Sequence, residues 1–150
     1  MKLTSSEGKE FEDATKYRQL VGRLIYLTTT RPDISYVVGI LSRFMHKPCE
    51  GHWSAVKRVL RYLKGTQGIE IKYSKVDDFK LIGYLDSNFD GDKETIVSTF
   101  GYIMSLGSEA VSWRSHKQSV PADSTTEAKY VAAAEAMKIC NKNKRTPLHY

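Results

Sequence analysis

Three stretches in the first half of the chain repeat apolar residues at the spacing of three to four that is typical of an α-helix. They cover residues 17–31, 32–47 and 50–64. The first should end before Pro32, because the residue before a proline disfavours helical backbone, and the third should end at Gly65. The stripes are expected to form a core, and their members are Tyr17, Leu20, Val21, Leu24, Ile25, Ile34, Val37, Val38, Leu41, Phe44, Met45, Trp53, Val56, Leu60 and Leu63.

After Gly65 the pattern changes to the alternation of apolar and polar residues that is typical of β-strands. It predicts strands over residues 69–74, 80–86, 98–106 and 110–115. Because short connections join the last three strands, we expect these to form an antiparallel meander.

A fourth helix is predicted to begin at Ser124, which with Glu127 fits a capping box, and to continue through an alanine-rich body. The expected fold class is therefore α+β, with a three-helix segment, a three-stranded meander and one further helix. The expected organisation is a flexible lead-in at 1–16, the helices at 17–66, the sheet and last helix at 67–142, and a tail at 143–150.

Composition places the chain among globular proteins, with 41% apolar and 27% charged residues over 150 positions. The first residues are polar and acidic, which argues against a signal peptide, and no apolar run is long enough to cross a membrane. Cys49 and Cys140 lie far apart and match no metal-binding spacing. We therefore expect an intracellular, cytoplasmic chain with reduced thiols.

Positive charge is concentrated in the first half of the chain. Residues 17–64 hold nine Lys and Arg against two acids, a balance of +7, so the rest of the chain contributes −1 to the total of +6. Four of the nine gather on one side of the third predicted helix, namely Lys57, Arg58, Arg61 and Lys64. This pattern favours a surface for a polyanion, and an ordinary solvated basic face is the simpler alternative.

The strand at 80–86 ends in a cluster of carboxylates. Asp86, Asp90 and Asp92 fall within seven positions, and carboxylate oxygens are ligands that Mg²⁺ prefers. The alternative is a polar turn without a ligand.

Five segments of the chain resemble successive blocks of the copia-type retrotransposon polyprotein. They are YRQLVGRLIYLTTTRPDISYVVGILSRFM, HWSAVKRVLRYLKGT, GYLDSNFDGD, STFGYIMSLGSEAVSWRSHKQ and STTEAKYVAA, in the family's order and spacing. The resemblance implies that the first three helices belong to the thumb or connection region that ends a reverse transcriptase. It also implies that the strands and the helix after them open a ribonuclease H domain.

The resemblance assigns catalytic, metal-binding roles to two residues, Asp86 and Glu127. Ribonuclease H cleaves the RNA of an RNA–DNA hybrid with two Mg²⁺ ions, which four carboxylates of the family hold. The motifs that carry the third and fourth carboxylates have no match in this sequence, so we expect a truncated unit without autonomous nuclease activity. Other departures from the family are Lys129 in place of an acid, Asp123 in place of an apolar residue and Asp90 in place of a small one.

In the family's fold, the strand after the first helix of the domain pairs with the first strand. Without it, the strand at 80–86 should have an open edge that can pair with another chain. The expected interaction edge comprises Leu81, Gly83, Tyr84 and Leu85.

Three functional hypotheses follow from the sequence. The first is a retrotransposon-derived protein that acts through self-association or a host protein at this edge, with a deleterious effect on the host cell as one outcome. The second is a module that binds an RNA–DNA hybrid or RNA through the basic helix at 50–64. The third is a residual ribonuclease completed by another chain; only this hypothesis needs a cofactor, Mg²⁺, and none of the three needs a small molecule or membrane insertion.

Overall fold

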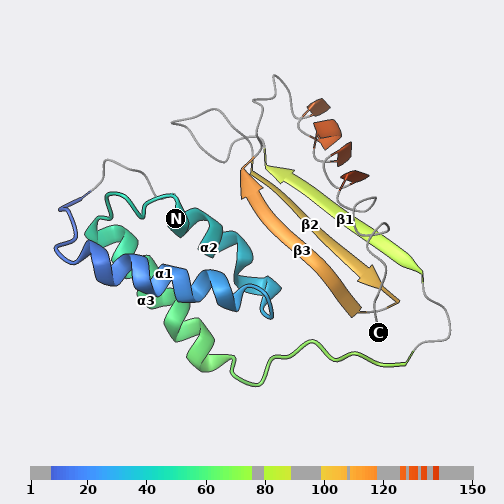
Figure 1. Cartoon of the computed structure of the whole chain (residues 1–150), viewed down its shortest axis with the longest axis horizontal. Helices are drawn as coiled ribbons and strands as arrows, with labels where there is room; N and C mark the ends of the chain where they lie inside the picture. The colour runs from blue at the N-terminus through green and yellow to red at the C-terminus, as the bar shows by residue number, and fades with distance from the viewer. Residues whose placement is uncertain are drawn as a thin grey trace. The chain divides into compact units, whose positions relative to one another are not determined.

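The computed structural model describes residues 8–75, 80–88, 99–107 and 109–117, together with nine positions between 126 and 138. It divides into two compact units, Met1–Lys72 and Tyr73–Tyr150. The first unit is helical, and the second contains a three-stranded antiparallel sheet (Figure 1). The α+β fold class is therefore confirmed.

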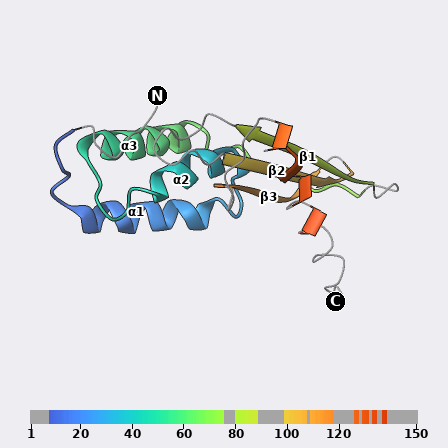
Figure 2. The same cartoon turned by 90° about the horizontal axis from the view of Figure 1, so that it is seen from above.

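The helical unit contains α1 (Ala14–Leu27), the short 3-10 turn η1 (Pro32–Ile34), α2 (Ser35–Ser42) and α3 (Glu50–Gly65). The three predicted helices are present, but the second is short and begins with the 3-10 turn. The α1 helix begins earlier than the apolar pattern indicates because Asp13 caps it, accepting a hydrogen bond of 2.8 Å from the Lys16 backbone. The α2 helix packs against both α1 and α3 (Figure 2).

One apolar core joins the three helices. Its buried members are Tyr17, Val21, Leu24, Ile34, Val38, Leu41, Ala55, Val56 and Val59. The Tyr17 hydroxyl donates to the Leu41 carbonyl at 2.9 Å, and burial raises the pKa of this phenol well above its ordinary value. The predicted stripe of α3 is partly wrong, because Leu60 is 38% exposed while Val59, which the stripe omits, is buried.

Part of the expected lead-in makes defined contacts with the segment before α3. The Phe11 amide donates to the Pro48 carbonyl at 2.9 Å, and the Glu50 amide donates to the Lys9 carbonyl at 3.0 Å. The Phe11 ring also stacks on Trp53 with a centroid distance of 4.7 Å. These contacts tie residues 9–11 to the start of α3.

The strand predicted at 69–74 is wrong. Residues 69–75 have no strand structure, and Ile69 and Tyr73 are 53% and 63% exposed. Alternating side chains favour extended backbone, but a strand also needs a neighbour that completes its hydrogen bonds. In the described part of the chain, no strand pairs with this segment.

The predicted meander is confirmed, with β1 (Leu81–Asn88), β2 (Thr99–Leu106) and β3 (Glu109–Lys117) in that order (Figure 1). Leu81 faces Leu106 and Asp86 faces Gly101 in the first pair of strands. Alternate residues of β2, namely Phe100, Tyr102 and Met104, bury their side chains on one face of the sheet. Gly107 makes the turn to β3 with a positive φ of 66°, which suits glycine.

The described residues between 126 and 138 all have helical backbone, as the fourth predicted helix requires. Its expected cap, Ser124, lies outside the described residues, as do Asp90, Asp92, Asp123 and Cys140. In the part of the chain that the structure describes, no helix is both long and apolar enough to span a membrane.

Candidate functional site

The four basic side chains predicted on the third helix are all exposed on α3: Lys57, Arg58, Arg61 and Lys64. Three of them, Lys57, Arg61 and Lys64, are spaced four and three residues apart. In an α-helix this spacing confines them to a sector of about 60° and extends them over about 10 Å along the axis. They therefore form one continuous cationic row.

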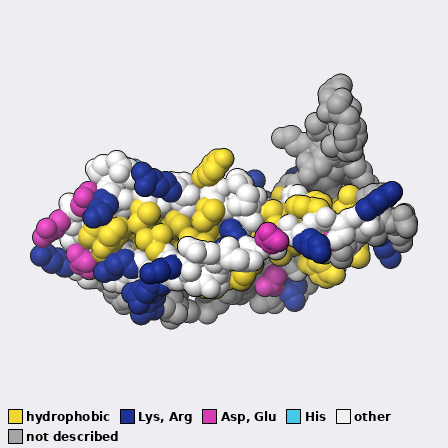
Figure 3. Space-filling model, turned by 90° about the horizontal axis from the view of Figure 1, so that it is seen from below, with side chains coloured by type: hydrophobic (Ala, Val, Ile, Leu, Met, Phe, Trp, Pro, Cys, Tyr) yellow, Lys and Arg dark blue, Asp and Glu magenta, His cyan; other side chains and the backbone are white. Residues whose placement is uncertain are grey.

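Apolar side chains accompany the cationic row. Leu60 is exposed between its members, and Trp53 and Leu63 are partly buried against the core. The Lys16 ammonium of α1 lies 5.6 Å from the centre of the Trp53 ring, which brings a further cation beside α3. On the helical unit, Figure 3 shows an apolar stripe with Lys and Arg side chains along its sides. We call Trp53, Lys57, Leu60, Arg61 and Lys64, with Lys16, the α3 surface.

The beginning of α3 is held by Cys49 and His52. The Cys49 amide donates to Nδ1 of His52 at 3.0 Å, while the Cys49 side chain accepts from the His52 backbone, so the two residues form a reciprocal cap. The His52 ring is buried and stacks on Phe44 at 3.8 Å between centroids. These two residues therefore have a structural role at the start of the helix.

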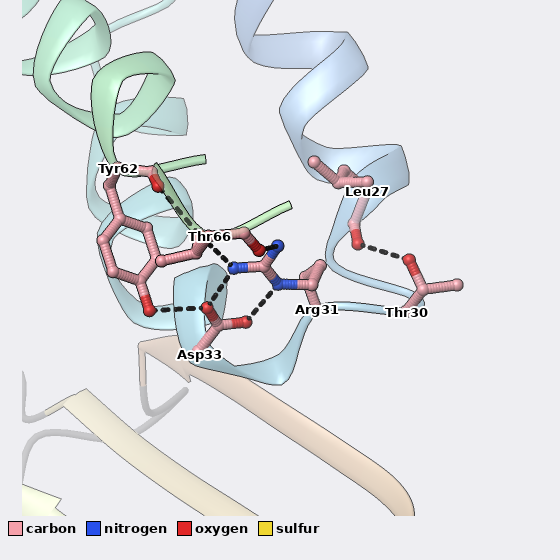
Figure 4. Close-up of polar contacts among 6 residues, drawn as sticks. All are labelled: Leu27, Thr30, Arg31, Asp33, Tyr62 and Thr66. Carbon is pink, nitrogen blue, oxygen red and sulfur yellow. Dashed lines mark hydrogen bonds and ion pairs between the residues drawn. The ribbon is translucent and has the colours of Figure 1, made fainter. Parts of the chain in front are cut away.

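The end of α3 is held by a buried arginine from the turn before α2 (Figure 4). The Arg31 guanidinium donates to both carboxylate oxygens of Asp33, at 2.9 and 2.7 Å. It also donates to the Thr66 carbonyl at 3.1 Å and to the Thr66 hydroxyl at 2.8 Å. The Tyr62 hydroxyl donates to Asp33 at 2.9 Å and completes the network.

These contacts shift three pKa values. The hydrogen bonds from Arg31, and then the one from Tyr62, hold the pKa of Asp33 below its ordinary value despite partial burial. The bond to Asp33 raises the pKa of Arg31 and also that of Tyr62. Asp33 is therefore ionised and Tyr62 neutral over the physiological range, which preserves the network.

The sequence pattern does not predict this network. By charge alone, Arg31 is one of the nine cations in residues 17–64 that could face a polyanion. The structure removes Arg31 from that set, because its side chain is only 11% exposed and is paired with Asp33. The sequence indicates a special role for Arg31 only in that residues 30–33 lie within the first segment that resembles the retrotransposon family. Nothing in its spacing indicates that Arg31 reaches Thr66, which lies 35 positions further along the chain.

The two expected catalytic carboxylates lie on different elements of the second unit. Asp86 is exposed near the end of β1, and Glu127 is exposed within the helical positions after 126. Within the described residues, no group of three or more His, Cys, Asp or Glu side chains gathers in a way that could hold a metal ion. Their roles in catalysis and in binding Mg²⁺ stay predictions.

The residues expected at the interaction edge are exposed on β1. Leu81, Tyr84 and Leu85 are 43%, 63% and 45% exposed, and Gly83 is exposed between them. Among the described strands, β1 pairs only with β2, so it occupies one end of the sheet order. An apolar strand at the end of a sheet offers unpaired backbone groups to another chain.

Comparison with known proteins identifies relatives that are similar over most of this chain. The chain is 47% identical over 133 residues, 89% of its length, to the retrovirus-related Pol polyprotein from transposon RE2 of Arabidopsis thaliana. It is 42% identical over 136 residues to the corresponding polyprotein from transposon TNT 1-94 of Nicotiana tabacum. It is also 46% identical over 121 residues to the secreted RxLR effector protein 161 of Plasmopara viticola, of which it covers 85%.

The chain spans only 9% of the RE2 polyprotein and 10% of the TNT 1-94 polyprotein. No family model matches the chain. No solved structure matches it either.

Proposed function

The chain belongs to the retrovirus-related Pol polyproteins of copia-type retrotransposons, and from this premise we propose that it binds an RNA–DNA hybrid through the α3 surface. Such binding does not require a complete catalytic site. The identity of 42–48% with transposon polyproteins supports the link to retrotransposition. The resemblance of the helices to the end of a reverse transcriptase favours a hybrid over other nucleic acids.

The observation that carries the proposal is the alignment of Lys57, Arg61 and Lys64 on one exposed side of α3. A row of about 10 Å suits contacts with successive phosphates, which supply most of the affinity of sequence-independent binding. Leu60, which is exposed beside the row, adds apolar surface that can contact the sugars of the hybrid. The networks at Cys49 and Arg31 hold both ends of the helix, which fixes the backbone from which these side chains project.

Charge reversal on α3 tests the proposal. We expect the Lys57→Glu, Arg61→Glu variant of the whole chain to lose hybrid binding by at least about tenfold, measured by fluorescence anisotropy with a labelled hybrid of about 20 base pairs. The matched control, Arg18→Glu with Lys72→Glu, makes the same change in net charge at exposed positions outside α3. Equal loss in both variants would show a general charge effect, and undiminished binding by the α3 variant would exclude this helix as the site.

A second candidate function is supported by a different observation, the exposure of apolar residues along β1. Leu81, Tyr84 and Leu85 are exposed on a strand that, among the described residues, has one neighbour. In this function β1 is an edge that binds a protein strand by β-augmentation.

Amide exchange in dilute protein tests this second function. Amides at an open edge exchange quickly, so the Gly83 amide should exchange much faster than the amides that bond to β2. Strong protection of Gly83 in protein dilute enough to be a monomer would show that its own chain already covers the edge.

A further inference from the structure

The hydrogen-bond pattern of β1 identifies which residues face away from β2. The Gly107 amide donates to the Lys80 carbonyl at 3.0 Å, in register with the facing pair Leu81 and Leu106. In an antiparallel ladder, alternate residues bond to the same neighbour. The even-numbered residues therefore bond to β2, and Leu81, Gly83 and Leu85 direct their backbone groups to the other side.

Residues 80–86 have the sequence Lys-Leu-Ile-Gly-Tyr-Leu-Asp. The order of charged, apolar and glycine positions is the same whether the segment is followed forwards or backwards. Gly83 is its centre, apolar residues follow on each side, and opposite charges stand at the two ends. Lys80 and Asp86 are both exposed. A strand with this symmetry is complementary to an antiparallel copy of itself.

We infer that β1 pairs with β1 of a second copy of this chain, antiparallel and around a two-fold axis at Gly83. This inference rests on the proposed role of β1 as an interaction edge, and it identifies the partner and the register. The facing residues across the axis are Lys80 with Asp86, Leu81 with Leu85, Ile82 with Tyr84, and Gly83 with Gly83.

The backbone geometry fits this register. Leu81, Gly83 and Leu85 are the residues that direct N–H and C=O groups outward, and the register pairs only these with one another across the axis. The result is about six backbone hydrogen bonds between the copies. Among the described residues, a Cβ atom at position 83 would meet nothing within 4 Å, so the face of the sheet beside Gly83 is open.

The side chains on one face of the sheet support the same register. Tyr84 is 63% exposed and faces Ile103 of β2, which is 43% exposed. Pairing places Ile82 of the second copy on the other side of Tyr84. Facing aromatic and β-branched residues stabilise antiparallel pairs, so the contact covers apolar surface that is exposed in the single chain.

Neighbouring registers lack this complementarity. Moving one strand by two residues keeps the outward backbone groups paired but sets a charge against an apolar residue. In one direction Lys80 faces Tyr84, and in the other Ile82 faces Asp86. Only the register centred at Gly83 sets both terminal charges opposite partners of opposite sign.

A charge swap tests the inference in the whole chain. Because of the two-fold axis, Lys80→Asp or Asp86→Lys alone creates two like-charged pairs, and we expect about tenfold weaker dimerisation in sedimentation equilibrium at low salt. The double variant restores opposite charges and should recover the affinity of the natural chain. A natural chain that is a monomer at all concentrations up to several hundred micromolar would overturn the inference, and so would a double variant no better than the single ones.

The controls Lys72→Asp and Glu70→Lys make the same charge changes at exposed positions outside β1. They should leave the dimer affinity unchanged. If they weaken the dimer as much as the β1 variants do, net charge rather than strand pairing is responsible, and the inference fails.

Amide exchange at several concentrations separates this inference from the proposed edge function. Protection of Leu81, Gly83 and Leu85 that increases with concentration supports both. Fast exchange of these amides at every concentration would leave the edge open but overturn self-pairing. Strong protection at a concentration where sedimentation shows a monomer would overturn both, while hybrid binding by α3 would be unaffected.

Discussion

Arg31 directs its guanidinium into the helical unit, where four hydrogen bonds join it to Asp33 and Thr66. Removing the guanidinium leaves the Asp33 carboxylate and the carbonyl and hydroxyl of Thr66 without this donor. We therefore expect Arg31→Ala to lower the free energy of unfolding of the helical unit by about 2 kcal/mol, measured by urea titration. Arg18→Ala, on the exposed side of α1, serves as the control and should change it by less than about 0.5 kcal/mol.

The lowered pKa of Asp33 predicts a pH dependence of stability. The folded state holds this carboxylate ionised, so its contribution is complete above the ordinary pKa of about 4 and is lost as the pH falls through the lowered native value. We expect Asp33→Asn to reduce the loss of stability in this acidic range. Urea titrations at a series of pH values from neutral to about 3 measure it, and parallel pH profiles of the two proteins would contradict the assignment.

At the scale of elements, the side of α3 that faces the core matches its predicted apolar stripe only in part. Val56 is fully buried, whereas Leu60 is 38% exposed on the α3 surface. Val56→Ala should therefore destabilise the unit by about 2 kcal/mol, and Leu60→Ala by less than about 1 kcal/mol, in the same urea assay. If Leu60→Ala costs as much as Val56→Ala, Leu60 belongs to the core and cannot contribute to a binding surface.

The elements that could be predicted are those whose local sequence pattern and packing partners favour the same secondary structure. The three helices, the meander and the exposed basic side chains of α3 followed from apolar spacing and charge alone. The strand at 69–74 did not form because alternation describes one segment, whereas a ladder depends on a second segment at the right distance. The Arg31 network could not be predicted for the same reason, because Arg31 and Thr66 come together only when α3 packs against α2.

At the scale of the whole molecule, hybrid cleavage and hybrid binding make different demands. Binding needs a cationic surface, whereas cleavage with two Mg²⁺ ions needs several clustered carboxylates. In the described residues no such cluster forms around Asp86. We therefore expect no Mg²⁺-dependent cleavage of a labelled hybrid by this chain alone in a gel assay, and cleavage that Asp86→Asn abolishes would contradict that expectation.

The dependence of hybrid binding on salt tests the central claim most directly. Each phosphate contact contributes about 0.9 to the slope of log affinity against log salt for a duplex. We predict that replacing Lys57, Arg61 and Lys64 together by Gln reduces the slope by about 2 to 3, while the matched replacement of Lys9, Arg18 and Lys72 leaves it unchanged. An unchanged slope and affinity in the α3 variant would contradict the claim that this surface binds nucleic acid.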